Sequence, residues 1–227
     1  EVEIFISFVY SKLMKHLQKK SVEEKIISFK EKLLFSEYSL PSAYFFKFLA
    51  ENSPNSILFC TQQFIKAVKK AIFHKSNEVK LVGYETMKIF LQFLNHTQTP
   101  QTQSIVSGLY ITAQRKSKDF VCRHGALLIY SLLLETVPFL VSSDIVSLAP
   151  YLTPIFQKFS SELRGIALHI IVLLWVNYPK SFDNMNFEQV RSVIWKETID
   201  NPTQFSTQAL LILLQKDPTI VKSIDVV

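Results

Sequence analysis

The chain has 227 residues, of which 48% are hydrophobic and 19% are charged, and its formal net charge is +6. This balance allows a well-filled core and excludes wholesale disorder. With only four glycines, the sequence argues against an all-β fold rich in tight turns and contains no glycine-rich phosphate-binding motif.

The first 53 residues keep a helical rhythm without an internal repeat. They predict three helices with breaks near Ser21 and at SLPS, over residues 1–20, 21–36 and 41–51. The chain opens inside this rhythm with acidic residues and no signal-peptide pattern. We therefore expect a fragment of a longer protein whose first 53 residues form degenerate repeat helices.

From residue 54 on, the pattern predicts four helix pairs, at residues 54–95, 100–137, 142–179 and 185–217. The first helix of each pair is expected near residues 54–73, 101–115, 144–157 and 187–198. Short polar turns separate the two helices of each pair, at 74–77, 116–119, 158–161 and 200–203. Prolines at 100, 138, 179 and 218 fall between pairs, where a helix must stop.

The second helices align without a gap at a period of 42 residues. An apolar residue recurs at Val79, Val121, Leu163 and Phe205. Four positions later a small residue recurs at Gly83, Gly125, Ala167 and Ala209, and four further on an apolar residue at Met87, Ile129, Ile171 and Leu213. Positions four apart share a helix face, and a small side chain lets a neighbouring helix approach closely. The alignment predicts repeated helix hairpins.

A two-helix unit of this length, with Val79-Lys80 or Leu163-Arg164 opening the second helix, resembles the HEAT/armadillo repeat class. The resemblance covers about residues 55–217 and departs from the pattern where Cys122 and Ser206 occupy the basic position. It implies an all-α fold: a single right-handed α-α superhelix of about five helix pairs. In that class the second helices line a concave binding surface, and the turns within pairs form a ridge along one edge.

Positive charge is concentrated in the first half of the chain. Residues 1–123 carry 18 Lys and Arg and 10 Asp and Glu, a net charge of +8, whereas residues 124–227 have a net charge of −2. Two consecutive turns are basic, and a solenoid brings them side by side. The candidate partner-binding residues are Lys75, Lys80, Arg115, Lys116, Lys118, Arg123 and Arg164. The alternative is that these side chains only solvate exposed helix faces.

Three functions follow from these features. The first is a non-catalytic scaffold or adaptor that presents a concave helical face and a basic turn ridge to a protein partner within a larger complex. The second is direct binding to a polyanionic polymer, either the acidic surface of microtubules or nucleic acid. The third is a structural spacer within a longer helical protein. Since lysine outnumbers arginine, bidentate phosphate recognition is disfavoured.

No enzyme, cofactor or metal site is predicted. The five histidines show no metal-binding spacing, and no nucleophile motif occurs. Phenylalanines at helical spacing are interpreted as core, and Cys60 and Cys122 as buried free thiols in a reducing compartment. The longest apolar run, 165–176, is interrupted by His169 and is shorter than a membrane span requires. We expect an intracellular protein, cytoplasmic or nuclear, without a membrane span.

Overall fold

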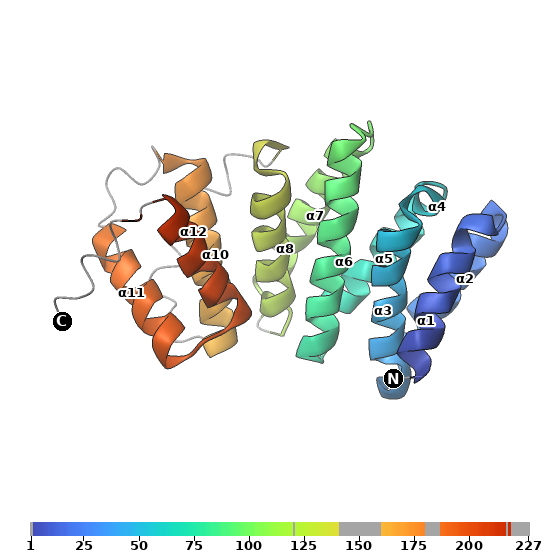
Figure 1. Ribbon diagram of the computed structural model, residues 1–227, viewed down its shortest axis with the longest axis horizontal. Helices are drawn as coiled ribbons and strands as arrows, with labels where there is room; N and C mark the ends of the chain where they lie inside the picture. The colour runs from blue at the N-terminus through green and yellow to red at the C-terminus, as the bar shows by residue number, and fades with distance from the viewer. Residues whose placement is uncertain (1, 120, 141–159, 180–186, 217, 219–227) are drawn as a thin grey trace. The chain divides into compact units, whose positions relative to one another are not determined.

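The computed structural model describes residues 2–119, 121–140, 160–179, 187–216 and 218 (Figure 1). Within these residues all regular structure is helical, without a strand, which confirms the all-α class. The chain divides into two compact units, Glu1–Leu132 (unit 1) and Leu133–Val227 (unit 2). The single superhelical array remains a prediction.

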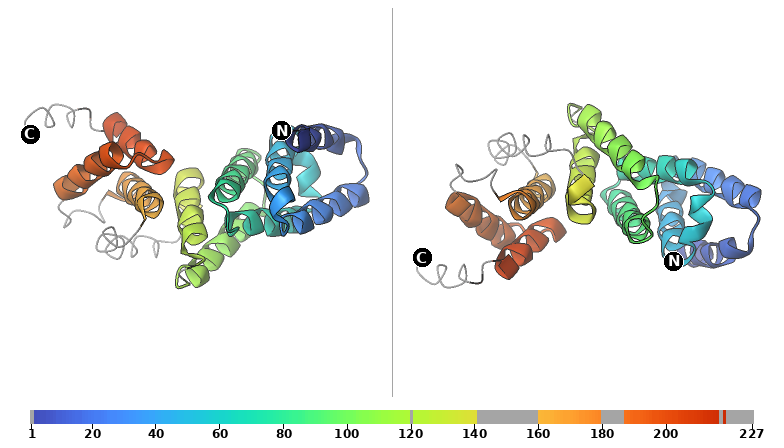
Figure 2. Two further views of the ribbon diagram at one scale, coloured as in Figure 1. Left: turned by 90° about the horizontal axis from the view of Figure 1, so that it is seen from below. Right: turned by 90° about the horizontal axis from the view of Figure 1, so that it is seen from above.

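Unit 1 is built from two layers of helices. Its elements are α1 (Val2–Leu13), the 3-10 turn η1 (Met14–His16), α2 (Lys19–Lys32), α3 (Ser36–Asn52), α4 (Pro54–Leu58), α5 (Thr61–Ile72), α6 (Asn77–His96), α7 (Thr102–Lys116) and the start of α8 (Arg123–Thr136). Helices α1, α3 and α6 pack side by side in chain order (Figure 1, Figure 2). Helices α2 and α5 pack against each other and against α3 and α6, so the core lies between the layers.

A chain of phenylalanine rings crosses the core of unit 1. Phe29 of α2 stacks on Phe45 of α3 with the ring centroids 3.9 Å apart, and Phe46 follows at 5.3 Å from Phe45. Phe64 of α5 lies 6.0 Å from Phe46 and 5.0 Å from Phe90 of α6. Edge-to-face and offset aromatic pairs stabilise a core beyond the area they bury. The interpretation of the phenylalanines as core residues is confirmed for these five.

The small-residue column of the 42-residue alignment is buried in every copy. Gly83 and Gly125 are buried, and Ala167 and Ala209 have no exposed surface. A Cβ added to Gly83 would lie 2.9 Å from the Cβ of Ala71, so α6 approaches α5 as closely as a glycine allows. The apolar column four positions on is at most 1% exposed at Met87, Ile129, Ile171 and Leu213.

The first apolar column does not behave uniformly. Val79 and Phe205 are buried, whereas Val121 is 83% exposed and precedes the first residue of α8. The prediction that an apolar residue opens every second helix in the core is therefore wrong for Val121. The turn before α8 is closed instead by Asp119, whose carboxylate accepts a hydrogen bond from the Val121 backbone N–H at 3.0 Å.

Two predicted boundaries near the N-terminus are also wrong. The first break lies at Leu17–Gln18 rather than at Ser21, since α2 begins at Lys19. The break expected at SLPS is absent, because α3 runs from Ser36 to Asn52 through Pro41. Pro41 lies near the start of this helix, where its missing N–H removes a single hydrogen bond, and its carbonyl accepts a bond from Ser7 Oγ at 3.0 Å.

Most of the remaining helix boundaries lie at the predicted prolines and polar turns. Pro100, Pro138 and Pro179 all lie after the end of an α-helix, and the turns at 74–77, 116–119 and 200–203 each join two helices and share one residue with a helix end. The first helix predicted at 54–73 is divided into α4 and α5 by a turn at Phe59 and Cys60. The helix predicted at 144–157 lies outside the described residues.

Unit 2 contains the end of α8, the 3-10 turn η2 (Pro138–Leu140), α10 (Ser161–Asn177), α11 (Phe187–Asp200) and α12 (Gln204–Lys216). Helix α10 packs against α12 and α11 (Figure 2), and its residues 165–174 are all buried. At its end, Tyr178 donates a hydrogen bond to the Pro138 carbonyl at 2.6 Å. The prediction of a buried helix around His169 is thus confirmed, and the His169 ring lies 5.6 Å from that of Phe205.

The start of α12 is fixed by a reciprocal cap. The Ser206 N–H donates to Thr203 Oγ1 at 3.1 Å, and the Thr203 N–H donates to Ser206 Oγ at 2.9 Å. This is a capping box in which serine takes the place usual for glutamate. A Cβ at Gly165 would collide with Thr203 Oγ1, so this glycine leaves room for the cap.

Candidate functional site

The candidate site lies at one edge of unit 1, where two turns within helix pairs come together. The first turn of α8 packs on the end of α5: a Cβ at Gly125 would lie 2.5 Å from Phe73 Cδ1 and 2.8 Å from the Ile72 carbonyl oxygen. Nζ of Lys80, in the first turn of α6, lies 3.5 Å from Nδ1 of His124. The first turns of α6 and α8 are both at the lower edge of unit 1 in Figure 1.

Four exposed cations surround these turns: Lys75 before α6, and Arg115, Lys116 and Lys118 at the end of α7. We call these four residues the basic turn edge. Within the described part of the chain, no carboxylate forms an ion pair with any of them. Asp119 is the acid beside Lys116, and its pKa is lowered by hydrogen bonds from the Cys122 thiol and the Val121 N–H.

Two histidines lie behind the basic turn edge, and both are kept neutral. Burial, and then the charge of Lys80, lowers the pKa of His124 to about 4. Burial and the charges of Lys75 and Lys80 lower the pKa of His74. The edge therefore combines exposed positive charge with imidazoles that add no charge at neutral pH.

Three of the seven predicted partner-binding residues are used inside the fold. Lys80 is only 9% exposed, and its Nζ donates to Asn77 Oδ1 at 3.1 Å. Half-buried Arg123 donates from Nε to the Ser117 carbonyl at 3.3 Å and closes the turn before α8. Arg164 belongs to unit 2, where its Nη2 lies 2.9 Å from Oε1 of Glu197.

The sequence contained a signal for this inward placement. Lys80 and Arg164 occupy the same register of the 42-residue alignment, three positions before Gly83 and Ala167. Residues three apart share a helix face, so both side chains start on the face that carries the buried small residue. A count of charges along the chain does not show that Lys80 and Arg164 point inward, because it does not include the direction of each side chain.

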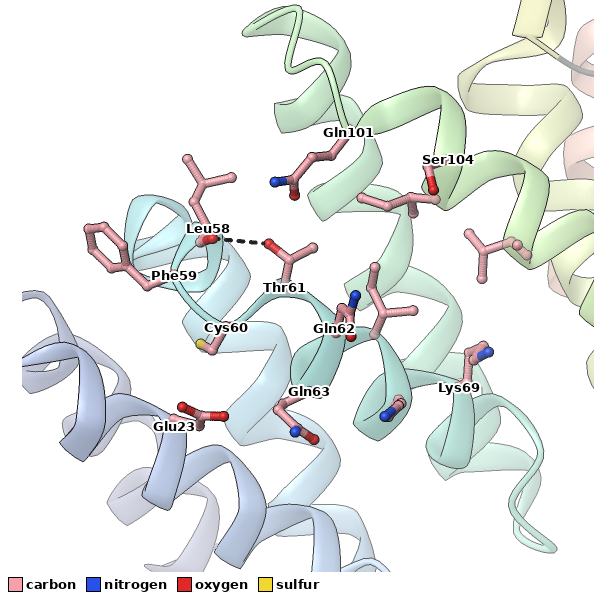
Figure 3. A pocket seen from close by; sticks show the side chains of 15 residues that line it. Glu23, Leu58, Phe59, Cys60, Thr61, Gln62, Gln63, Lys69, Gln101 and Ser104 are labelled. Carbon is pink, nitrogen blue, oxygen red and sulfur yellow. Dashed lines mark hydrogen bonds between the residues drawn. The ribbon is translucent and has the colours of Figure 1, made fainter.

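Sequence reasoning missed a groove on unit 1. It has a volume of about 680 Å³ and lies between the end of α4, one side of α5 and the first half of α7 (Figure 3). Its lining combines apolar, amide and cationic side chains, with one acid from α2. The lining includes Glu23, Phe59, Gln62, Gln63, Lys66, Lys69, Gln101 and Gly108.

Both cysteines are free thiols; Cys60 is buried and Cys122 half-buried. Burial and the nearby charge of Glu23 raise the pKa of Cys60 to about 11. This confirms the prediction of free thiols, and of burial for Cys60. A thiol with so high a pKa is a poor nucleophile at neutral pH.

Comparison with known protein families, with curated proteins and with solved structures finds no match to this chain. In the described residues, no group of three or more His, Cys, Asp and Glu side chains is arranged to hold a metal ion. None of the helices described combines the length and the apolar character needed to cross a bilayer.

Proposed function

We propose that the protein is a HEAT-like binding module that holds an acidic surface of a partner protein through the basic turn edge. The observation that carries this proposal is the packing of Gly125 on Phe73, which brings two basic turns to one edge of unit 1. Lys75, Arg115, Lys116 and Lys118 are exposed there.

The electrostatics favour a partner that supplies carboxylates. A single exposed ion pair contributes little, about 0–1 kcal/mol, but clustered cations raise the local potential and the association rate of an acidic partner. Three of the four cations are lysines, which act as hydrated point charges rather than as bidentate forks. This composition suits a broad acidic protein surface better than the reading of individual phosphates.

The test compares two double variants with the same change in net charge. Lys75→Glu with Lys118→Glu reverses the edge, whereas Lys19→Glu with Lys20→Glu reverses two exposed lysines at the start of α2. Interacting proteins are captured with each variant in parallel and quantified by mass spectrometry. We expect a defined set of acidic interactors to be lost from the edge variant and retained by the α2 variant.

The same proteins are then tested with duplex DNA, single-stranded RNA and microtubules at two salt concentrations. If one of these polymers binds, if its affinity falls steeply with salt, and if the edge variant does not bind it, the function is binding to a polyanionic polymer and not to an acidic protein. Interactors retained in full by the edge variant, with no polymer bound at low salt, would refute both functions. If the wild type also captures no specific interactor, the structural spacer is left.

A further inference from the structure

We propose that the groove between α5 and α7 binds a short extended segment of a partner protein, in which an acidic side chain is flanked by apolar ones. This site is separate from the basic turn edge and does not depend on it.

The α7 wall is shaped for close approach of a second backbone. Gly108 lies in the middle of α7, is exposed, and has no atom within 4 Å of the position a Cβ would take. Glycine in a helix interior is destabilising relative to alanine. The other three glycines are each explained by a neighbouring atom that excludes a side chain. No neighbouring atom excludes a side chain at Gly108. The absence of a side chain there leaves the backbone of α7 accessible from the groove.

The α5 wall supplies two positive charges that have no carboxylate partner among the described residues. Lys66 and Lys69 both line the groove, and among the described residues no carboxylate pairs with either of them. Nζ of Lys69 donates to Thr112 Oγ1 at 3.3 Å, and Thr112 in turn donates to the Gly108 carbonyl at 2.7 Å. Lys69 is thus held over the groove, where a carboxylate would relieve its repulsion with Lys66.

Apolar contacts are available on both sides of these charges. Phe59 is 60% exposed at the end of α4, although an aromatic ring of this size is normally covered. Leu58, Ile65 and Ile105 add half-buried apolar surface along the groove. A ligand with apolar side chains beside its acid would bury surface on both walls.

Amide side chains favour an extended ligand backbone. Gln62, Gln63 and Gln101 line the groove, and each can both donate and accept hydrogen bonds (Figure 3). A helical ligand satisfies its own backbone groups, whereas an extended segment leaves its N–H and C=O groups free to pair with these amides.

Charge placement disfavours a nucleic acid in this groove. Figure 3 shows Glu23 at the side of the groove opposite Lys69. A nucleic-acid strand carries a phosphate at every nucleotide and would meet this carboxylate, whereas a peptide with one acid can orient toward the lysines alone.

The experiment selects ligands from a phage library of random 12-residue peptides with the full chain as bait. The enriched peptides are synthesised with a fluorescent label, and their affinities are measured by anisotropy. We expect Asp or Glu next to apolar residues in the enriched set. Replacing that acid by its amide should weaken binding at least tenfold.

Matched variants assign the binding to the groove. Gly108→Trp fills it and Lys66→Glu reverses its charge, and each should weaken the peptide at least tenfold. Lys70→Glu, on the same helix as Lys66, should change the affinity less than twofold, since Lys70 does not line the groove. Phe59→Ala removes a ring that is 60% exposed, so it should disturb folding less than a core substitution, and it should also weaken the peptide.

Several results would overturn the proposal. They are no enrichment of peptides, an enriched set without acids, undiminished affinity for the Gly108→Trp variant, or displacement of the peptide by a single-stranded oligonucleotide. The basic turn edge variant, Lys75→Glu with Lys118→Glu, should bind the peptide normally. Loss of partners in that variant and loss of peptide in the groove variants are therefore independent outcomes.

Discussion

At the scale of single residues, the glycines show how one residue type serves two purposes. Gly83, Gly125 and Gly165 each lie where an atom of a neighbouring element would meet a Cβ at less than 3.0 Å. Gly108 lies where nothing would be met within 4 Å. The 42-residue alignment identified Gly83 and Gly125 as packing residues, but it gave no reason for Gly108.

This contrast leads to opposite expectations for two alanine substitutions. Gly83→Ala places a Cβ 2.9 Å from the Ile72 backbone nitrogen, so α5 and α6 must separate, and stability should fall by about 1–3 kcal/mol. Gly108→Ala should raise stability by about 0.5–1 kcal/mol, because it meets no atom and reduces the freedom of the unfolded chain. Urea denaturation followed by circular dichroism measures both. Equal midpoints for the two variants would contradict this account.

The neutral histidine at the basic turn edge predicts a dependence of stability on pH. The pKa of His124 is about 4 in the folded protein and, as for an ordinary histidine, about 6.5 in the unfolded chain. As the pH falls below about 6.5, His124 binds a proton in the unfolded chain but stays neutral in the folded protein. The free energy of unfolding therefore decreases until the pH reaches about 4. Because the ring is only partly buried, we expect about 1–2 kcal/mol.

Denaturant titrations of wild type and His124→Gln between pH 7.5 and pH 4 isolate this contribution. The variant should lose less stability across that range than the wild type. Lys80→Met should also reduce the loss, since the charge of Lys80 helps to lower the pKa of His124. Substitution of exposed His96 by Gln is the control. Parallel curves for wild type and the His124 variant would contradict the prediction.

At the scale of helices, the repeat made the second half of each pair predictable. Four aligned copies indicate α6, α8, α10 and α12, because a buried small residue recurs in each. The first 53 residues have no such copies, and the position of Pro41 suggested a break that α3 does not have. The groove could not be predicted, because it depends on the separation of α5 and α7 and not on any motif in either.

The cap of α12 gives a test of one helix end. Thr203→Val keeps the shape of the side chain but removes the oxygen that accepts the Ser206 N–H at 3.1 Å. Loss of such a cap destabilises a helix by about 1 kcal/mol. Hydrogen exchange should therefore speed up in the first turn of α12. Thr207→Val, on the exposed side of the same helix, is the matched control and should leave the exchange rates unchanged.

At the scale of the whole molecule, the sequence gives the number of charged residues but not which of them are exposed or paired. Residues 1–123 carry 18 basic and 10 acidic residues. The count does not distinguish Lys80, which is 9% exposed, from Lys75, which is exposed. It also does not distinguish Arg164, which forms an ion pair with Glu197, from the exposed Arg115. Four of the seven predicted residues belong to the basic turn edge, and only the packing of α8 on α5 explains why they share it.

Heparin chromatography separates the effect of this local field from that of the net charge of +6. Lys75→Glu with Lys118→Glu and Lys19→Glu with Lys20→Glu lower the net charge equally, so both double variants should bind a heparin column less tightly than wild type. If the basic turn edge concentrates the positive potential, the edge variant should elute at clearly lower salt than the α2 variant, because nearby cations act on one polyanion together. Thermal melts confirm that both variants are folded. Elution of the two variants at the same salt concentration would mean that these lysines act only through net charge.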